Sequence, residues 1–598
     1  MMANTASASK VAPPKTGKSK SSPKKAKKPP LSVAEKAAKK TKTEHRAAIR
    51  ASFTKAGFRR VTDISDREFT YANQKTDLDD VFVYENIVVL AEYTCSQTSG
   101  VGDHLKNKKH IFDKILIDPE AFLRFLADRF PASAEQLASA YHDQQKILRI
   151  IYCSRFDFDS HYKVNVPGPV YMDYPAVRYF SAVSDAVQKS SRFELIHFLD
   201  IDATQVGLNG KIDVAVPSKD YSGTLLPEAH SHFDSGFKIV TFYADPDALL
   251  RTAYVLRKDG WRDSMNLYQR MISKPKVEAI RAYLKKQKRV FINNIIVTLP
   301  PDVQPLNEKL ETVNPAALKK TEPVTINLPD RPNSIGIIDG QHRVFAYHEA
   351  VLDDPHIAKL RFQQNLLVTG IIYPTTLSNI EREKFEARLF LEINSMQTNA
   401  KSHLKQAIGL VLDPFASESI AARVLSLLAR SGPLQGVVEQ YFFDTDKLKT
   451  SSIVSYGLKP LVKTGGVDSL FSIWEHTARD EVAQGKNDEA LAEYIAFCAA
   501  TINKLLVSVR KNLTSGRWTT DRNNERRVLT TTYVNSFLIT LRLLIKAGES
   551  LADVELDKSF SGIDDFDFKK YHSSQYKRMA EEIVETYFGI KPSNPPVI

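Results

Sequence analysis

The sequence predicts a multidomain α/β protein with a disordered, basic N-terminal tail and an all-helical C-terminal domain. Two observations predict this class: strand-like and helix-like apolar patterns alternate from about residue 63 to about 410, and only helical patterns follow. At 598 residues the chain is long enough for three or four domains. We therefore expect four segments, namely a tail (1–50), an α/β domain (51–205), a second α/β domain (206–410) and a helical domain (411–598).

The tail carries the whole net charge of the chain. Residues 1–50 contain twelve Lys and two Arg against two Glu, a net charge of +12, and the full sequence also sums to +12, so residues 51–598 are balanced. The tail has few large apolar side chains, so burial cannot offset the entropy lost on ordering, and we expect disorder. Such an arm either binds nucleic-acid phosphates without sequence preference or is a solubilising extension.

Composition also restricts the cellular setting. Three cysteines, Cys95, Cys153 and Cys498, are too few and too scattered for a disulfide framework or a closed zinc site, which favours a reducing cytoplasm. No segment approaches the roughly 20 uncharged apolar residues of a membrane helix, so no membrane partner is expected.

The first α/β region mixes strands and helices in a definite order. A helix is expected over Lys36–Phe58, and the run VFVYENIVVLAEY predicts a hairpin with a tight turn at Glu85-Asn86. The elements expected after it are a helix at 104–116, a helical run at 119–149, a strand at 146–154 and a strand entering a helix at 170–189.

The second α/β region begins with a loop-rich stretch over residues 200–240. The elements expected after it are a helix at 276–287, a strand at 293–299, a Pro-rich loop at 300–332, a strand at 334–339, a helix at 342–351, a strand at 365–373 and a helix at 379–395. Long helices are expected in the last segment over residues 419–430, 489–509 and 533–547.

The most distinctive motif is the pentapeptide Asp339-Gly340-Gln341-His342-Arg343, placed where an apolar strand turns into a helix. Glycine allows close approach to a ligand, and free N–H groups at a helix start attract anions. Arg343 adds a guanidinium suited to phosphate or carboxylate. His342 is a candidate phosphate ligand or proton-transfer group. Asp339 would hold a metal, orient His342 or simply cap the helix.

The segment IIDGQHRVFAYHEA is similar to the signature of DGQHR-domain proteins, which are related to DndB of the DNA phosphorothioation system and more distantly to ParB-like and sulfiredoxin folds. YQRMISKPKVEAIRAYLKKQKRVFINNIIVTL and LFLEINSMQTNAKSHL resemble the elements before and after that signature, so the resemblance covers about residues 260–410. It implies a ParB-like domain in which the pentapeptide, with Arg270, Asn394 and Gln397, contacts ATP or another nucleoside triphosphate. No GxxxxGK[ST] run is present, which excludes a P-loop ATPase.

Acidic residues at both ends of the predicted hairpin form a second candidate site. Folding the hairpin brings Asp79 or Asp80 near Glu92, and two carboxylates at a strand end can hold Mg²⁺. Such an ion would assist phosphodiester cleavage. The same acids on a solvated turn would have no function.

This pattern resembles the PD-(D/E)XK restriction-endonuclease core, with Asp79 or Asp80 as the first acid and Glu92 as the second. The chain departs from that family because Thr94 occupies the position of its lysine. Lysines on the next expected helix, Lys106, Lys108 or Lys109, would have to supply the ammonium, or the domain would be an inactive nuclease fold kept for DNA contact.

Three functions follow as hypotheses. The first is a DNA-associated, nucleotide-binding regulator or accessory of a DNA modification or phage-defence system, as the DGQHR resemblance implies. The second is a Mg²⁺-dependent DNA endonuclease, and the third is a non-catalytic structural partner. Homodimerisation and partner proteins of a modification system are compatible with all three.

Overall fold

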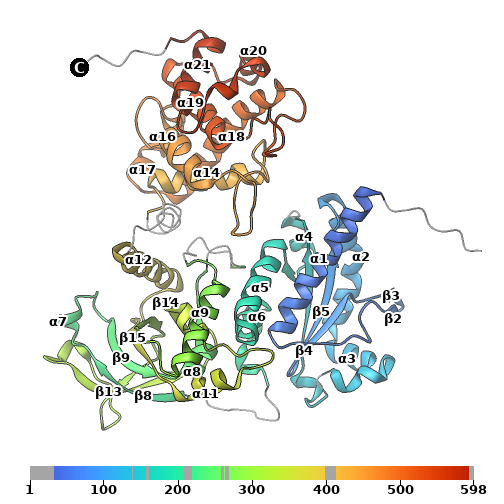
Figure 1. The fold of residues 1–598 in the computed structure, drawn as a ribbon, viewed down its shortest axis with the longest axis vertical. Coiled ribbons are helices and arrows are strands. Elements are labelled where there is room, and N and C mark those ends of the chain that lie inside the picture. The colour runs from blue at the N-terminus through green and yellow to red at the C-terminus, as the bar shows by residue number, and fades with distance from the viewer. Residues whose placement is uncertain are drawn as a thin grey trace, which may run out of the picture.

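The computed structural model of the chain describes residues 32–137, 139–156, 160–207, 218–257, 261–262, 269–397 and 413–591. Figure 1 shows three regions: an N-terminal α/β region in blue to teal, a central region on a curled sheet, and a helical region in orange to red. The mixed α/β class with a helical C-terminal region is confirmed. Residues 1–31 of the predicted tail lie outside the described residues.

The first helix, α1 (Val33–Lys55), corrects the boundary expected at residue 50. It begins at a capping box, in which a serine hydroxyl and a glutamate side chain satisfy each other's backbone N–H groups. Its apolar face packs against α5 (Tyr174–Val187), and Phe53 is fully buried there. Residues 33–50 are therefore helical and belong to the folded body, in agreement with the helix expected over 36–58.

A five-stranded sheet of order β1-β4-β5-β6-β7 forms the N-terminal region. β4 and β5 make the predicted antiparallel hairpin, whereas β6 runs parallel to β5 and β7 parallel to β6. α2 and α3 cover one face of this sheet, and α1 and α5 cover the other. The strands are β1 (Arg59–Arg60), β4 (Asp80–Tyr84), β5 (Ile87–Thr94), β6 (Ile147–Ser154) and β7 (Val170–Met172), with a separate hairpin of β2 (Phe69–Tyr71) and β3 (Gln74–Thr76). The further helices are α2 (Thr98–Ile117), α3 (Pro119–Arg129), α4 (Ser160–Asn165) and α6 (Arg192–Phe198).

The central region is built on a curled eight-stranded sheet of order β10-β14-β11-β15-β9-β8-β13-β12. Its strands are β8 (Ser218–Leu225), β9 (Lys238–Ala244), β10 (Ala253–Tyr254), β11 (Ile295–Leu299), β12 (Pro305–Leu306), β13 (Glu322–Pro329), β14 (Ile335–Asp339) and β15 (Leu366–Ile372). Its helices are α7 (Glu228–Ser231), α8 (Pro246–Thr252), α9 (Lys274–Gln287), α10 (Gln341–Phe345), α11 (Pro355–Gln363) and α12 (Asn379–Gln397).

One apolar core joins the N-terminal and central regions. Buried side chains of α1, α5 and α6 form a continuous cluster with those of α8 to α11 and the inner face of the eight-stranded sheet. α12 packs on the opposite face of that sheet. The boundary expected at residue 205 is therefore not a break in the hydrophobic core.

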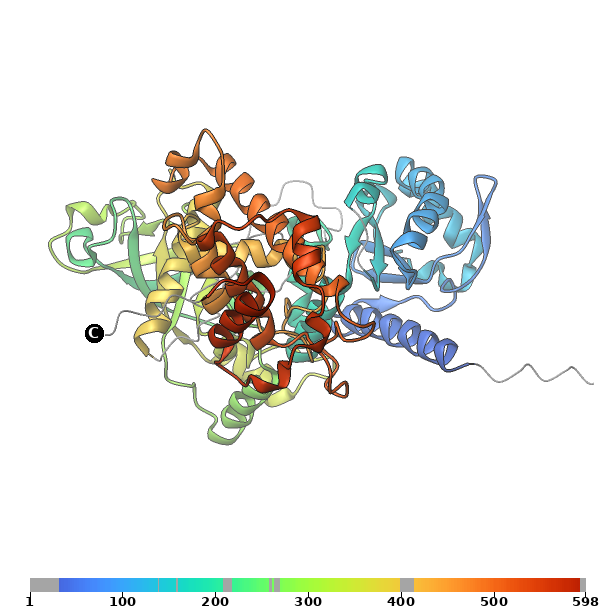
Figure 2. The same cartoon turned by 90° about the horizontal axis from the view of Figure 1, so that it is seen from above.

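The helical region has a core of its own. Its helices are α14 (Ser417–Arg430), α15 (Thr450–Ser452), α16 (Lys459–Val462), α17 (Arg479–Ala483), α18 (Asp488–Lys511), α19 (Thr531–Ala547), α20 (Asp553–Ser559) and α21 (Tyr576–Phe588). Within the described part of the chain, α18 alone has the length and composition of a membrane-spanning helix, and more than half of its most apolar window is buried among its neighbours. Seen from above, this region lies over the central one (Figure 2).

Four expectations for single elements were wrong. The stretch at 200–240 contains β8, and the Pro-rich loop at 300–332 contains β13, which pairs with β8 along its full length. The helix expected at 342–351 stops at Phe345, so α10 is only five residues long. Regular helix in the run at 119–149 ends at Arg129.

Candidate functional site

The pairing of β4 with β5 determines how Asp79 and Asp80 lie relative to Glu92. Asp80 pairs with Ala91, and continuing that register by one residue sets Asp79 opposite Glu92. Glu92 lies on the α2 face, where Lys108 contacts it, and Asp80 points toward α1. Asp79 precedes β4, and its carboxylate lies at the edge of the sheet against Arg46 of α1. The N–H of Tyr93 donates to Asp79 Oδ2 at 2.7 Å, which fixes the carboxylate at this edge.

Glu92 is a buried acid near the carboxyl end of a core strand. Only 2% of its surface is exposed, and β5 is otherwise a continuous apolar run. Lys108 of α2 supplies its counter-ion, with 2.7 Å between Lys108 Nζ and Glu92 Oε1, and Lys108 also lies 2.9 Å from Asp77 Oδ1. Burial raises the pKa of Glu92 to about 7, and Lys108 opposes that rise. The pKa of this carboxyl therefore lies in the range that a general base or a switchable metal ligand needs.

Arginines of α1 and β1 neutralise the other two acids. Asp79 forms an ion pair with Arg46, which also binds Asp66. Asp80 is fully buried between Arg50, at 2.6 Å, and Arg60. Asp80 is thus a structural ion-pair acceptor on the far face of the sheet.

Polar side chains surround Glu92 at the carboxyl ends of β5 and β6. Tyr152 is its neighbour in the parallel register, and the Tyr152 hydroxyl lies 2.9 Å from His104 Nδ1 on α2. Thr94, which replaces the expected lysine, is buried and accepts the N–H of Ser96 at 3.1 Å. Lys106 is exposed on a different side of α2 from Lys108.

The oxygen ligands at this site are of the type that a divalent cation prefers. Asp79 and Glu92 provide hard oxygen ligands on adjacent strands, and Mg²⁺ commonly binds one or two carboxylates while keeping several waters. Among the described residues, no group of three or more His, Cys, Asp or Glu side chains converges to hold a metal. The site would therefore use two carboxylates, and Arg46 would have to release Asp79 to free its oxygens.

The polar side chains of the pentapeptide at 339–343 form hydrogen bonds and ion pairs within the protein. Arg343 pairs with Asp339 at 2.8 Å and donates to Asn294 O at 2.8 Å. Gly340 has φ 107°, and a Cβ there would lie 2.6 Å from Ile295 Cδ1, so this turn requires glycine. The strand-to-helix turn is as predicted, but its arginine already has an internal carboxylate.

Gln341 and His342 also have internal partners. Gln341 accepts from Arg257 Nε at 3.2 Å and donates to Arg270 O at 3.3 Å. Burial lowers the pKa of His342 to about 4, so the ring is neutral near pH 7 and its Nε2 accepts the N–H of Ser273 at 3.0 Å. These contacts connect β14 with the start of α9, which favours a structural role for the motif.

Arg270 contacts the motif through its backbone carbonyl, which accepts from Gln341. The side chain of Arg270 is exposed. Asn394 Nδ2 donates to Phe390 O one turn back within α12, at 2.9 Å. Gln397 ends α12, and its side chain lies outside the described residues.

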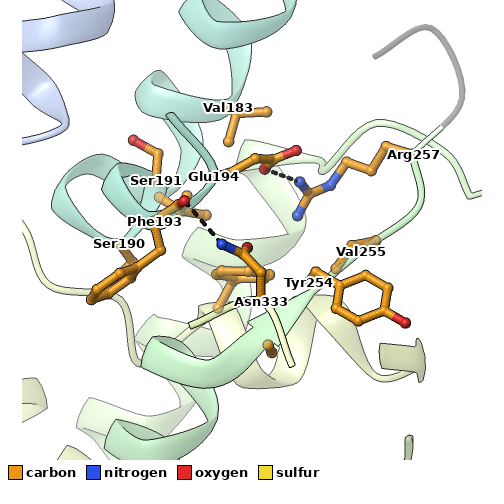
Figure 3. A pocket seen from close by; sticks show the side chains of 12 residues that line it. Val183, Ser190, Ser191, Phe193, Glu194, Tyr254, Val255, Arg257 and Asn333 are labelled. Carbon is orange, nitrogen blue, oxygen red and sulfur yellow. Dashed lines mark hydrogen bonds and ion pairs between the residues drawn. The ribbon is translucent and has the colours of Figure 1, made fainter. Parts of the chain in front are cut away.

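A small cavity lies where α6 meets the central region (Figure 3). Its volume is about 10 Å³, which is room for one water molecule at most. Arg257 crosses it to Glu194 at 2.9 Å, and Asn333 donates to Phe193 O. A more open hollow of about 300 Å³ lies beside Glu85. None of the residues 339–343 lines either cavity.

Comparisons with protein-family models, curated proteins and solved structures gave no match to this chain. Its family is therefore not established by similarity, and function has to be argued from the geometry.

Sequence reasoning missed several residues around Glu92. Arg46 and Arg50 lie four apart on α1, a spacing that could have indicated one basic helix face turned toward the acids. Asp77, His104 and Tyr152 carried no such signal, because only the packing of α2 and β6 brings them to the site.

Proposed function

We propose that the N-terminal region binds nucleic acid and cleaves its phosphodiester backbone with the help of a divalent cation. The observation that carries this proposal is the buried Glu92 carboxylate, with Lys108 Nζ at 2.7 Å and with Asp79 bound to the N–H of the next residue, Tyr93. Burying two charges costs free energy that a core of apolar side chains would not cost. Such a group with a perturbed pKa at a strand end is a candidate for chemistry.

The sheet around the site supports the proposal. β5 and β6 are parallel, and Glu92 lies near their carboxyl ends, the edge at which open α/β sheets commonly bind ligands. Arg46 pairs with Asp79 at this edge, and its release on cation binding would free a guanidinium suited to phosphate oxygens. An antiparallel hairpin followed by a helix and a parallel strand also agrees with the resemblance to the restriction-endonuclease core.

Each residue has a distinct expected role. Asp79 and Glu92 would hold the cation, which would supply Lewis-acid stabilisation of the phosphate and a more acidic water. Lys108 limits the rise in the pKa of Glu92. Its ammonium group, 2.7 Å from Glu92, would also stabilise the phosphate, which is the role of the family lysine whose position Thr94 occupies here.

A cleavage assay tests the proposal. Full-length protein is incubated with supercoiled plasmid and with linear single- and double-stranded DNA, in Mg²⁺, Mn²⁺ or chelator. We expect metal-dependent nicking or cutting by the wild type. Glu92→Gln and Lys108→Met should lower the rate at least a hundredfold, the size commonly seen when a group stabilising the transition state is removed.

The matched control is the pair Glu68 and Lys75 of the same region. Their ion pair also spans 2.7 Å, but it is exposed, so Glu68→Gln and Lys75→Met should cleave like the wild type. Metal-independent activity, or equal activity of Glu92→Gln and Glu68→Gln, would contradict the proposal.

The resemblance to DGQHR-domain proteins adds a biological setting, a role in DNA modification or defence with a nucleotide as regulator. We place the DNA chemistry at Glu92 because Arg343 and His342 are occupied by internal partners. In a thermal-shift titration, stabilisation of the wild type by ATP that Arg343→Ala abolishes would restore the nucleotide-binding alternative.

A further inference from the structure

A loop of the helical region reaches down to the N-terminal region. Figure 1 shows it descending between α14 and α5. Its tip contains Tyr441, Phe442 and Phe443, and the Asp444 carboxylate accepts the N–H groups of residues 440 and 441, which shapes the turn. The loop thus carries three consecutive aromatic rings, of which Phe443 contacts α5.

Arginines and aromatic rings alternate where this loop meets α5. Phe443 packs its edge on Tyr174 at 5.6 Å, and Tyr441 lies parallel to Phe443 at 5.2 Å. The Arg155 guanidinium lies 3.7 Å from the centre of the Tyr174 ring, and that of Arg178 lies 5.1 Å from the centre of Phe443. We call these five residues the aromatic stack.

The aromatic stack borders the candidate site. Arg155 directly follows β6, and its N–H donates to Thr94 O at 2.9 Å, two residues beyond Glu92. The stack therefore lies at the carboxyl edge of β5 and β6, the same edge as Glu92.

Two arginines bring positive charge to this edge. Within the described part of the chain, neither Arg155 nor Arg178 forms an ion pair with a carboxylate, and Arg178 is exposed. Phe442, at the tip of the loop, keeps 40% of its surface exposed. Guanidinium groups without a carboxylate partner beside half-buried aromatic rings and one exposed ring are a combination that binds phosphates and unpaired bases.

We propose that the aromatic stack, with Phe442, binds a single nucleic-acid strand and leads it to Glu92. This inference rests on the proposed function, and it names the substrate as single-stranded DNA or an unpaired end. Arg155 and Arg178 contact phosphates, and the rings of the loop stack on bases. Paired bases hide their faces in the duplex, so these rings discriminate against intact double-stranded DNA.

Fluorescence anisotropy in chelator tests the inference without cleavage. Single- and double-stranded oligonucleotides of one sequence are titrated over a series of salt concentrations, and we expect tighter binding of the single strand. Arg178→Gln should weaken binding and reduce the slope of log K against log salt by about 0.7, the value for one lost phosphate contact on a single strand. Phe442→Ala should weaken binding about tenfold and leave the slope unchanged.

Matched variants separate binding from packing. Phe362→Ala removes another exposed phenylalanine, and Arg289→Gln removes another arginine that lies over a tyrosine, and both should bind like the wild type. Phe442 is 40% exposed but also packs edge to face on Phe443, with 5.2 Å between the ring centres. Phe442→Tyr keeps this ring contact and should bind like the wild type, which separates the loss of stacking in Phe442→Ala from a change in loop packing.

Stronger binding of the duplex, or single-strand binding that neither Arg178→Gln nor Phe442→Ala weakens, would overturn the inference. Failure of the proposed function has a different signature. In that case Glu92→Gln and the wild type are equally inactive in cleavage, while the single-strand preference and its dependence on the stack remain.

Discussion

At the scale of single residues, two ion pairs with the same separation differ in how far they are buried. Lys108–Glu92 and Lys75–Glu68 both span 2.7 Å, but the first pair has side-chain exposures of 14% and 3% and the second 68% and 67%. Water screens the exposed pair, whereas Glu92 would be left nearly dry if its partner were removed. The two pairs therefore isolate the effect of burial.

Lys108→Met should lower the free energy of unfolding by about 3 kcal/mol, because it leaves a buried carboxyl without its counter-ion. Lys75→Met should change it by less than about 1 kcal/mol. Urea unfolding of both variants at pH 7 measures the difference. Equal effects would mean that Glu92 is better solvated than the structure shows.

The raised pKa of Glu92 also predicts how stability depends on pH. A folded pKa of about 7, above the ordinary 4.5, means that the folded protein keeps a proton that the unfolded chain has lost. The contribution of Glu92 to stability is therefore complete below pH 4.5 and declines as pH rises through 7.

Glu92→Gln removes this titration. Relative to the wild type, the variant should gain about 3 kcal/mol between pH 4.5 and pH 8, while other groups cancel in the difference. Paired urea curves at several pH values give the result. A difference that stays constant with pH would show that Glu92 titrates normally.

At the scale of whole elements, one buried acid, Glu386, links helix α12 to the central sheet. Glu386 is buried, and its Oε1 accepts hydrogen bonds from Tyr254 at 2.7 Å, Thr298 at 2.6 Å and Tyr373 at 2.7 Å. These three donors come from β10, β11 and the end of β15, so a single carboxylate spans a large part of the sheet. Burial raises the pKa of Glu386.

Glu386→Ala should lower the free energy of unfolding by about 3 kcal/mol or more, because it leaves three buried hydroxyls without their acceptor. Glu386→Gln keeps an oxygen acceptor and should cost about 1 kcal/mol. Thermal unfolding of both variants checks this order. If alanine were tolerated as well as glutamine, the three hydrogen bonds would not stabilise α12.

The elements that could be predicted from the sequence are those whose structure depends mainly on local residue patterns. The β4–β5 hairpin was predictable because apolar runs flank a tight turn, and α9, α12, α18 and α19 because their apolar residues recur with helical spacing. β8 was missed because Ser218–Leu225 contains few apolar residues. β13 alternates buried Val324, Ile326 and Leu328 with polar residues, but the prolines in and around it indicated a loop, and it forms a strand by pairing with β8. α10 ends early because the N–H groups of residues 349–351 donate to the side chains of Ser190, Asp353 and Gln188 and not to carbonyls one turn back.

The candidate site was predictable only in part. Asp79, Glu92 and a lysine from the next helix were identified, but the choice of Lys108 depends on which side of α2 faces β5. The sequence emphasised the pentapeptide, whose side chains bind one another and their neighbours. The aromatic stack joins residues nearly 290 positions apart, and no local pattern predicts such a contact.

At the scale of the whole molecule, the described residues form two bodies, each with its own hydrophobic core. The N-terminal and central regions share one core, and the helical region has another. The loop carrying Phe443 reaches from the second body to the edge where Glu92 lies. This arrangement places the helical region where it can contact a strand bound at that edge.

Binding of Mn²⁺, followed by electron paramagnetic resonance at pH 6 and pH 8, tests the central claim most directly. Because a carboxyl with a pKa of about 7 must lose its proton to bind a cation, the wild type should bind one Mn²⁺ about tenfold more tightly at pH 8 than at pH 6. Glu92→Gln should abolish this site and Glu68→Gln should retain it. Equal Mn²⁺ binding by the wild type and Glu92→Gln at both pH values would contradict the account.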